Sequence, residues 1–205
     1  GLGDVYKRQM GKHSVYITAN DLAAAGAEPV GIMLTILLPP KTEERELKEI
    51  MRGVESTCRE LNMEIMGGHT EITDVVKQPL LSLTGVGRMK KEQMMEPGGI
   101  KPGQDIVITK WIGLEGTSIA AKEKEKLLLE RFAPLFVDTA KGFDQYLSVL
   151  PEAKIAGAWG VSAMHDITEG GVFGALWEMA SGSDVGLDID LKTVSYTHLT
   201  LPTIA

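Results

Sequence analysis

Residues 29–39, PVGIMLTILLP, constrain the fold most strongly. This nearly continuous apolar run has the length of one strand and is bounded by Pro29 and Pro39. A run without polar alternation is typical of a strand whose two faces are both buried. It therefore predicts a sheet covered by other elements, in a protein of the α/β (α+β) class.

The following segment, residues 42–61, predicts an amphipathic helix. Thr42 is a suitable N-cap, and Glu43 and Glu44 fall in the first turn, where the helix dipole favours acidic side chains. Apolar residues then recur every three or four positions and form one stripe: Leu47, Ile50, Met51, Val54, Cys58 and Leu61. Cys58, the single cysteine, lies on that stripe, so we interpret it as a packed core thiol rather than a nucleophile.

Residues 96–105, EPGGIKPGQD, contain two prolines and three glycines, a composition typical of a linker. We therefore predict an N-terminal domain at residues 10–96 and a C-terminal domain at residues 97–193. Residues 1–9 lack an initiating Met and residues 194–205 lose periodicity, so both ends are predicted to be extraneous tails. The other expected elements are strands at 14–20, 63–68, 78–89, 105–110, 161–166 and 185–191, and helices at 21–27, 116–126, 136–160 (broken at Pro151) and 171–181.

Composition limits the class of partner. A formal net charge of -7 argues against a nucleic-acid partner, because such proteins usually present a basic face. It does not exclude a nucleotide whose phosphates are bridged to carboxylates by metal ions. The chain shows no apolar run near the roughly 20 residues of a membrane span and no signal peptide, and one cysteine suits a reducing compartment. We therefore expect a cytoplasmic protein with no membrane partner.

Three segments share a pattern that suits phosphate and metal binding. In each, a predicted strand ends, the chain turns through glycine or small polar residues, and a carboxylate stands near the next element. The candidate residues are Asn20 and Asp21 in TANDLAAAGA, Gly67, Gly68, His69, Thr70 and Glu71 in MGGHTEIT, and Asp166, Thr168, Gly170 and Gly171 in MHDITEGG. Helix N-termini and glycines admit anions, and carboxylates are ligands of Mg²⁺.

Each segment also has a purely structural interpretation. Asn20 or Asp21 could cap a helix, GGHT could be a tight turn with a solvent-facing histidine, and DITEGG could be a capped helix start. Lys110, at the end of the first strand predicted after the linker, could neutralise a phosphate or simply lie at the surface. Three such segments in one chain favour a functional site more than any one of them does.

The segments TANDLAAAGAEPV, IMGGHTEIT, KPGQDIVITK, GLEGTSIAA and HDITEGGVFGALWEMA together resemble the aminoimidazole ribonucleotide (AIR) synthetase-related superfamily. Their order and spacing match over nearly all of residues 10–191. The superfamily includes PurM-type synthetases, thiamine-monophosphate kinase, selenophosphate synthetase and HypE, and the GGHTE and EGT motifs are most similar to HypE-like members. The resemblance implies a PurM-like fold of two α/β domains, truncated here at both ends, with ATP-dependent chemistry in the cleft and a homodimer joined through N-terminal-domain strands.

By this resemblance Asp21 would bind Mg²⁺ that bridges ATP phosphates, and Gly67 and Gly68 would let the chain approach that site. The kinase and HypE branches usually carry an Asp where this chain has His69, so metal binding by His69 is open, with Glu71 as a substitute. The acidic ATP-binding segment expected before residue 10 and the C-terminal cysteine of HypE proper do not occur in this sequence. The chain therefore resembles a fragment, which we expect to be inactive alone.

The predicted function is that of an enzyme that uses Mg²⁺ and ATP to phosphorylate or activate a substrate oxygen of the amide or carbamoyl type. The substrate would be a small molecule or of the peptide-thiocarboxamide type. Asp166 and Lys110 are the candidate catalytic residues; Asn20, Gly67, Gly68, Thr70, Thr168, Gly170 and Gly171 are candidates for cofactor binding; Asp21, His69 and Glu71 are candidate metal ligands. The alternatives are a thiamine-monophosphate-kinase-like phosphotransferase and a non-catalytic nucleotide-binding or dimerisation module.

Overall fold

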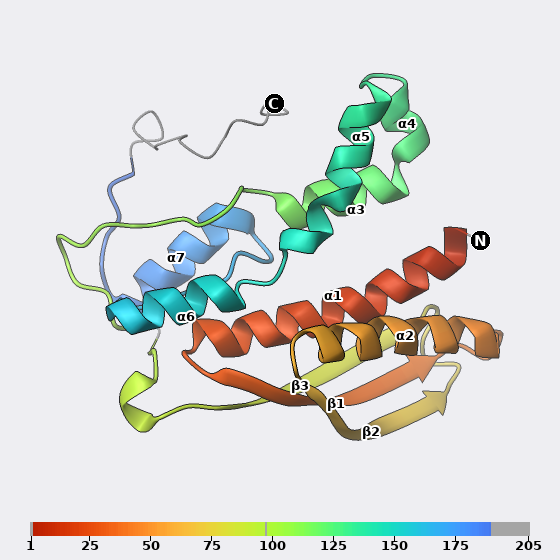
Figure 1. Cartoon of the computed structure of the whole chain (residues 1–205), viewed down its shortest axis with the longest axis horizontal. Coiled ribbons are helices and arrows are strands. Elements are labelled where there is room, and N and C mark those ends of the chain that lie inside the picture. The colour runs from red at the N-terminus through yellow and green to blue at the C-terminus, as the bar shows by residue number, and fades with distance from the viewer. Residues whose placement is uncertain (1, 97, 190–205) are drawn as a thin grey trace.

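A computed structural model describes residues 2–96 and 98–189 and confirms a mixed α/β chain (Figure 1). Three strands form one sheet in the order β2-β1-β3, with β2 parallel and β3 antiparallel to β1. The elements are α1 (Leu2–Ala24), β1 (Glu28–Leu38), α2 (Glu44–Glu60), β2 (Glu64–Ile72), β3 (Leu80–Arg88), η1 (Lys91–Gln93), α3 (Leu114–Glu123), α4 (Glu125–Leu129), α5 (Pro134–Lys141), η2 (Gly142–Tyr146), α6 (Leu150–Trp159) and α7 (Gly171–Ser183).

The apolar run at 29–39 forms β1, but only one of its faces is covered. Ile32, Leu34, Ile36 and Leu38 are buried in a core shared with α1 and α2. The alternate residues lie on the other face, where Met33 is 53% exposed. Figure 1 shows α1 and α2 on the same side of the sheet. The prediction of a strand buried on both faces is therefore wrong, because a continuous apolar run does not reveal how many covering layers are present.

The predicted helix at 42–61 is confirmed as α2, with a shifted cap. Its N-cap is Glu43 rather than Thr42, and the backbone N–H of Glu43 donates to the Glu46 carboxylate at 3.0 Å. Cys58 is 3% exposed, and burial raises the pKa of its thiol to about 11. The thiol is thus part of the core, as predicted, and stays protonated at neutral pH.

Residues 14–20 are helical, which corrects the prediction of a strand there. Val15, Ile17 and Thr18 are β-branched and suggested a strand, but Val15 and Ala19 stand one helical turn apart and are both fully buried in the core. Tertiary packing overrides the weak local preference. Consequently Asn20 and Asp21 lie near the C-terminal end of α1, not at a helix start, and neither is a helix N-cap.

Two glycines let α1 and α2 approach each other closely. A Cβ atom built at Gly53 of α2 would overlap the carbonyl oxygen of Arg8 in α1, and one built at Gly11 of α1 would overlap the carbonyl oxygen of Ile50 in α2. The two helices therefore pack backbone against backbone at this crossing. Residues 2–9 belong to α1, where Lys7 Nζ lies 3.3 Å from Glu46 Oε1.

The segment GGHTE is part of strand β2, which corrects the prediction of a turn. Gly68 pairs with Leu34, and His69 pairs with Thr35 of β1. A Cβ atom at Gly68 would overlap the Leu34 backbone, so the glycine is needed for this pairing. The whole of β2 is exposed to solvent.

After residue 97 the described elements are helices joined by irregular segments. The predicted helices are confirmed as α3, as α5 with η2 and α6, and as α7, although the interruption before α6 lies at residues 147–149 and Pro151 stands in its first turn. The strand predictions at 105–110 and 161–166 are wrong, and residues 185–189 are irregular too, while 190–191 lie outside the described residues. A strand requires a hydrogen-bonded neighbour, and the described sheet holds only β1, β2 and β3.

The division into two domains at 96/97 and the extraneous nature of residues 1–9 and 194–205 stay predictions. The second tail lies outside the described residues. In the described part of the chain, no helix is both long and apolar enough to cross a membrane.

Candidate functional site

One large cavity contains five of the twelve predicted site residues. It has a volume of about 1340 Å³ and lies among α1, α6, α7 and the irregular segments 100–113 and 160–168. Five of the predicted residues line it: Asn20, Lys110, Asp166, Thr168 and Gly171. Asp21 neighbours Asn20 on α1 and interacts with Asp166. The structure thus brings together two of the three segments that the sequence singled out.

Asp166 is the most deeply buried acidic residue of the cavity wall. The residue is 8% exposed, and its Oδ2 atom is buried without a hydrogen-bond partner. Burial raises the pKa of its carboxyl group, since a charged carboxylate is costly away from water. A buried polar oxygen without a partner is rare in folded proteins and indicates that something else can occupy that position.

Four further carboxylates interact with Asp166, those of Asp21, Glu115, Glu169 and Glu178. Burial raises the pKa of Asp21, and the negative charge of Asp166 raises it further. The pKa of Glu115, at the start of α3, is raised by burial and then by the charges of Glu169 and Asp166. Asp21, Glu115 and Asp166 therefore share an acidic environment to which α1, α3 and the segment before α7 contribute, and negative charge adds to burial in raising the pKa of each.

His165 is the basic group of this cluster. Its Nε2 atom lies 2.9 Å from Glu178 Oε2, and its Nδ1 atom lies 2.5 Å from the carbonyl oxygen of Asp166. Burial alone would lower the pKa of His165, but the hydrogen bonds to Asp166 and Glu178 raise it overall. With acceptors at both nitrogens, the imidazolium form is stabilised, and it offsets part of the acidic charge.

The carboxylates of this cavity suit a metal cation that takes its remaining ligands from water and from substrate phosphates. Among the described residues, no group of three or more His, Cys, Asp or Glu side chains is arranged to hold a metal ion by itself. Mg²⁺ usually binds through one or two carboxylates together with water and substrate phosphates. The partnerless Oδ2 of Asp166, with Asp21 beside it, fits this mode of binding.

The start of α7 adds a site for a negatively charged group. Gly170 is the N-cap with φ 77°, Gly171 has φ 60°, and both values favour glycine. The N–H of Gly171 donates to the Thr168 carbonyl at 3.1 Å, which closes the turn. A helix of 13 residues therefore begins beside Thr168 and Gly171 at the cavity wall, where its dipole favours an anion.

Asn20 uses its side-chain amide to hold the chain between η2 and α6. Its Nδ2 donates to the Leu147 carbonyl at 2.9 Å, and its Oδ1 accepts from the Val149 N–H at 2.9 Å. Asn20 is buried while making both bonds. Asn20 therefore acts as a clamp in the cavity wall, a role that the sequence did not predict.

Lys110 is also held by this part of the chain. Its Nζ donates to the Ser148 carbonyl and lies 3.0 Å from Glu152 Oε1, while Oε2 of Glu152 is buried without a partner. Its backbone is left-handed, with φ 59°, an uncommon conformation for a non-glycine residue. Lys110 therefore lines the cavity as part of an ion pair.

The residues of the GGHTE segment are not brought to the cavity. His69 and Glu71 lie near the end of β2 that points away from α6 and α7 (Figure 1), and His69 Nε2 is 3.3 Å from Glu71 Oε2. Both side chains are exposed. Gly67, Gly68 and Thr70 lie on the same strand, outside the cavity lining. Within this chain, the candidate metal ligands Asp21, His69 and Glu71 do not meet.

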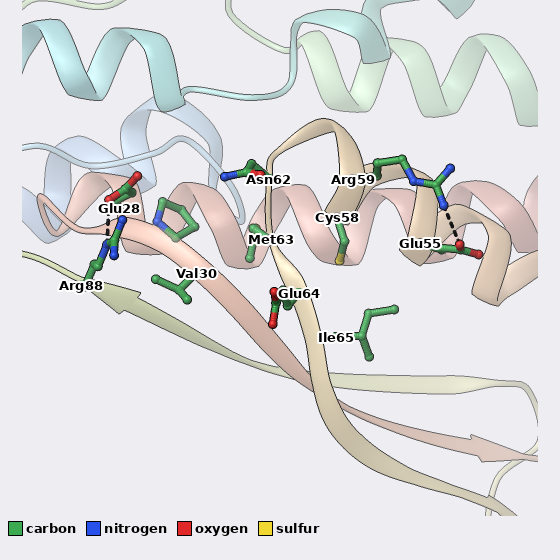
Figure 2. Close-up of a pocket in the computed structure, with 11 residues that line it drawn as sticks. Glu28, Val30, Glu55, Cys58, Arg59, Asn62, Met63, Glu64, Ile65 and Arg88 are labelled. Atoms are coloured by element: carbon green, nitrogen blue, oxygen red, sulfur yellow. Dashed lines mark hydrogen bonds and ion pairs between the residues drawn. The ribbon is translucent and has the colours of Figure 1, made fainter.

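A second hollow, of about 530 Å³, lies where β1 and β2 begin and β3 ends (Figure 2). Its charged rim is internally paired: Arg88 Nε is 2.9 Å from Glu28 Oε2, and one Arg59 nitrogen is 2.7 Å from Glu55 Oε1. It contains none of the residues that the sequence proposed for catalysis, cofactor binding or metal binding. Because both of its arginines are already paired with carboxylates, this hollow offers less to an anionic ligand.

Sequence reasoning missed Glu115 as a member of the site. It stands in GLEGT, one of the segments behind the family resemblance, but a Glu in a first helical turn is commonplace. His165 was likewise passed over. The sequence feature that could have identified His165 is its position directly before Asp166 in the same motif.

Comparisons with known proteins match nearly the whole chain. The sequence profile of the AIR synthase related protein, N-terminal domain, matches residues 4–89, and that of the AIR synthase related protein, C-terminal domain, matches residues 101–202. Carbamoyl dehydratase HypE of Cupriavidus necator is 30% identical over 186 residues, which cover 88% of this chain and 50% of that protein. Thiamine-monophosphate kinase of Methanospirillum hungatei is 34% identical over 185 residues, covering 88% and 56%.

Solved structures share the fold, which is therefore PurM-like, as the sequence predicted. The thiamine-monophosphate kinase AaThiL, complexed with AMPPCP and TMP, superposes with a TM-score of 0.72 at 19% identity, over 87% of this chain and 54% of that one. The hydrogenase maturation protein HypE in complex with ATP gives a TM-score of 0.53 at 16% identity, over 84% and 67%. The chain spans about half the length of the curated relatives named above.

Proposed function

Because this chain belongs to the AIR synthase related protein family, we propose that the whole protein binds ATP with Mg²⁺ and uses it to phosphorylate or activate a substrate oxygen. The amide or carbamoyl type of oxygen is proposed from the similarity to carbamoyl dehydratase HypE. The observation that carries the proposal is the buried Asp166 Oδ2 without a partner, at the wall of a large cavity. A cytoplasmic location is part of the proposal.

In this proposal Asp21 and Asp166 are the residues that would hold Mg²⁺ near the phosphates of ATP. Thr168, Gly170 and Gly171 present the start of α7 to an anionic group. When bound, Mg²⁺ would supply positive charge that offsets the charge of the phosphates. Lys110 fixes the cavity wall through its contacts with Ser148 and Glu152 and adds a cation to that wall. The β2 residues His69 and Glu71 take no part within one chain.

Asp21→Asn is expected to weaken binding of Mg·ATP by roughly tenfold or more, equivalent to about 1.4 kcal/mol. The substitution removes a negative charge beside Asp166. Stability should be unchanged or slightly higher, because a carboxylate near the C-terminal end of α1 opposes the helix dipole. Isothermal calorimetry and thermal melting on the same samples measure the two effects.

Asp74→Asn is the matched control, since Asp74 is exposed between β2 and β3. It should leave the affinity for Mg·ATP as it is. Equal affinity of the Asp21→Asn variant and the unsubstituted chain would contradict the metal role of Asp21.

A thiamine-monophosphate-kinase-like phosphotransferase is the second candidate, favoured by 34% identity to such a kinase. Products separate the two functions: a kinase transfers phosphate to a stable acceptor, whereas HypE-like chemistry activates an amide oxygen. A third class, a non-catalytic nucleotide-binding module, is distinguished by an absence of ATP hydrolysis in the whole protein.

The uncovered face of the sheet supports a homodimer. It presents Met33 of β1 and Leu80 of β3, which are 53% and 47% exposed. The family resemblance implies a homodimer joined through N-terminal-domain strands. Because β1 is the central strand of the described sheet, we propose that the partner covers this face rather than an edge of β1. Light scattering at micromolar concentration should give a dimer mass, and Leu80→Glu should shift it toward the monomer. A monomeric mass for the unsubstituted chain would contradict the dimer.

A further inference from the structure

His165 and Glu178 form a contact that the proposed function leaves without a role. Glu178 stands in α7, 13 positions after His165, which lies in the irregular segment before that helix. His165 Nε2 is 2.9 Å from Glu178 Oε2, and His165 Nδ1 is 2.5 Å from the carbonyl oxygen of Asp166. The imidazole thus joins the helix to the main chain that carries the buried carboxylate.

This contact closes one end of a short loop whose other end is already closed. At that other end, the Gly171 N–H donates to the Thr168 carbonyl at 3.1 Å, directly at the start of α7. At the first end, His165 is tied to Glu178, about two turns into the helix. Asp166 lies between the two ties, so it is held against the same helix whose start lies at the cavity wall. Without the tie at His165, only the backbone of residues 166–168 would relate the carboxylate to the helix.

The exposure of this pair indicates that stability is not its main contribution. The side chains of His165 and Glu178 are 26% and 55% exposed, and ion pairs of this kind contribute little to folding because water screens them. The Oδ2 atom of Asp166 is buried and has no hydrogen-bond partner, so no bond to that oxygen fixes its direction. The main chain beneath Asp166 has to do so, and that is the part that His165 contacts.

We propose that His165, anchored by Glu178, is the positioning residue that keeps the Asp166 carboxylate and the start of α7 directed at the same bound group. This role rests on the proposed function, in which Asp166 and the helix start address Mg²⁺ and a phosphate. Groups that orient a metal ligand through a hydrogen bond typically change metal affinity by roughly 10- to 100-fold when they are removed. The reason is geometric, because a carboxylate and a helix start can share one bound group only when both are correctly placed.

Glu178→Ala removes the anchor and tests this role in the full 205-residue chain. The readout is the ratio of the ATP dissociation constants measured by calorimetry without and with Mg²⁺. This ratio should fall by roughly tenfold or more. The melting temperature should stay close to that of the unsubstituted chain, because the pair is exposed. Glu178→Gln keeps an oxygen that can accept from His165 and should restore most of the ratio.

Amide hydrogen exchange in the nucleotide-free chain gives a second readout that depends on neither metal nor nucleotide. The Gly171 N–H closes the loop, so it should exchange severalfold faster in Glu178→Ala than in the unsubstituted chain. Glu55→Ala is the matched control, because it breaks an exposed ion pair of the same kind, with Arg59 at 2.7 Å in α2, outside the lining of the large cavity. It should change neither readout.

An unchanged Mg²⁺ ratio in Glu178→Ala would overturn the positioning role while leaving the proposed function intact. A fall in the ratio that Glu55→Ala shares, or that comes with a large fall in melting temperature, would show a merely structural contact and overturn the role as well. Equal ATP affinity with and without Mg²⁺ in the unsubstituted chain would overturn the proposed function, and the positioning role with it.

Discussion

Gly53→Ala is expected to destabilise the protein by about 1–3 kcal/mol. The added methyl group would overlap the carbonyl oxygen of Arg8, and Gly11 meets the Ile50 carbonyl at the same crossing. Both obstacles are backbone atoms, so no side chain can rotate away and the two helices must separate. Their separation would disturb the core around Ile50 and Val54, both of which are fully buried. Urea unfolding followed by circular dichroism measures the loss.

Gly157→Ala provides the matched control. Gly157 lies within α6, and a Cβ atom there meets no other atom within 4 Å. An alanine should therefore stabilise by roughly 0.5–1 kcal/mol through its better helix propensity. If Gly53→Ala were as stable as Gly157→Ala, the close crossing of α1 and α2 would be refuted.

Asn20→Ala is expected to cost roughly 2–4 kcal/mol, because it leaves two backbone groups without partners. The Leu147 carbonyl and the Val149 N–H both bond to the Asn20 amide. The clamp lies next to Trp111, whose ring packs edge-on against Tyr146 at 5.3 Å between centroids. Tryptophan fluorescence is therefore a suitable probe for unfolding, since all three tryptophans lie after residue 110.

Asn20→Asp separates the two hydrogen bonds. A carboxylate can still accept from the Val149 N–H but cannot donate to the Leu147 carbonyl, so a smaller loss of about 1–3 kcal/mol is expected. A direct nucleotide-binding role for Asn20 predicts a different pattern, in which Asn20→Ala weakens ATP binding but unfolds at the same urea concentration as the unsubstituted chain.

The sequence predicted elements whose signal is local. The stripe of α2 and the apolar runs of β1 and β3 repeat over many residues and were identified correctly. The helix predicted at 21–27 matches only the last four residues of α1. The part of α1 at residues 14–20 was missed because its β-branched residues favour a strand locally, whereas packing on α2 through Gly11 and Gly53 favours a helix. Residues 105–110 have a strand-like composition, but strand assignment depends on pairing partners, which no single segment encodes.

The candidate site divides in the same way: local sequence motifs predict some of its residues, and only the folded chain reveals the others. Asp21 and Asp166 stand in motifs that resemble a known family, and the structure brings them together. Glu115 joins them only because the cavity brings α3 to the segment before α7, which spacing along the chain cannot reveal. The cofactor-binding role predicted for Asn20 stays a prediction, and its structural role was not foreseen because its hydrogen-bond partners lie 127 and 129 positions away in the sequence.

Because Asn20 and its two hydrogen-bond partners are far apart in the sequence, they leave the ribosome at different times. The first 88 residues contain α1, α2 and the complete three-stranded sheet, so this part can pack while the ribosome is still translating the rest. The Asn20 amide must then stay hydrated until Leu147 and Val149 emerge, roughly ten seconds later at ordinary elongation rates. The cavity that α1 shares with α6 and α7 is therefore the last part of the molecule to form. A nascent chain stalled before residue 147 would carry a folded sheet but would lack this cavity.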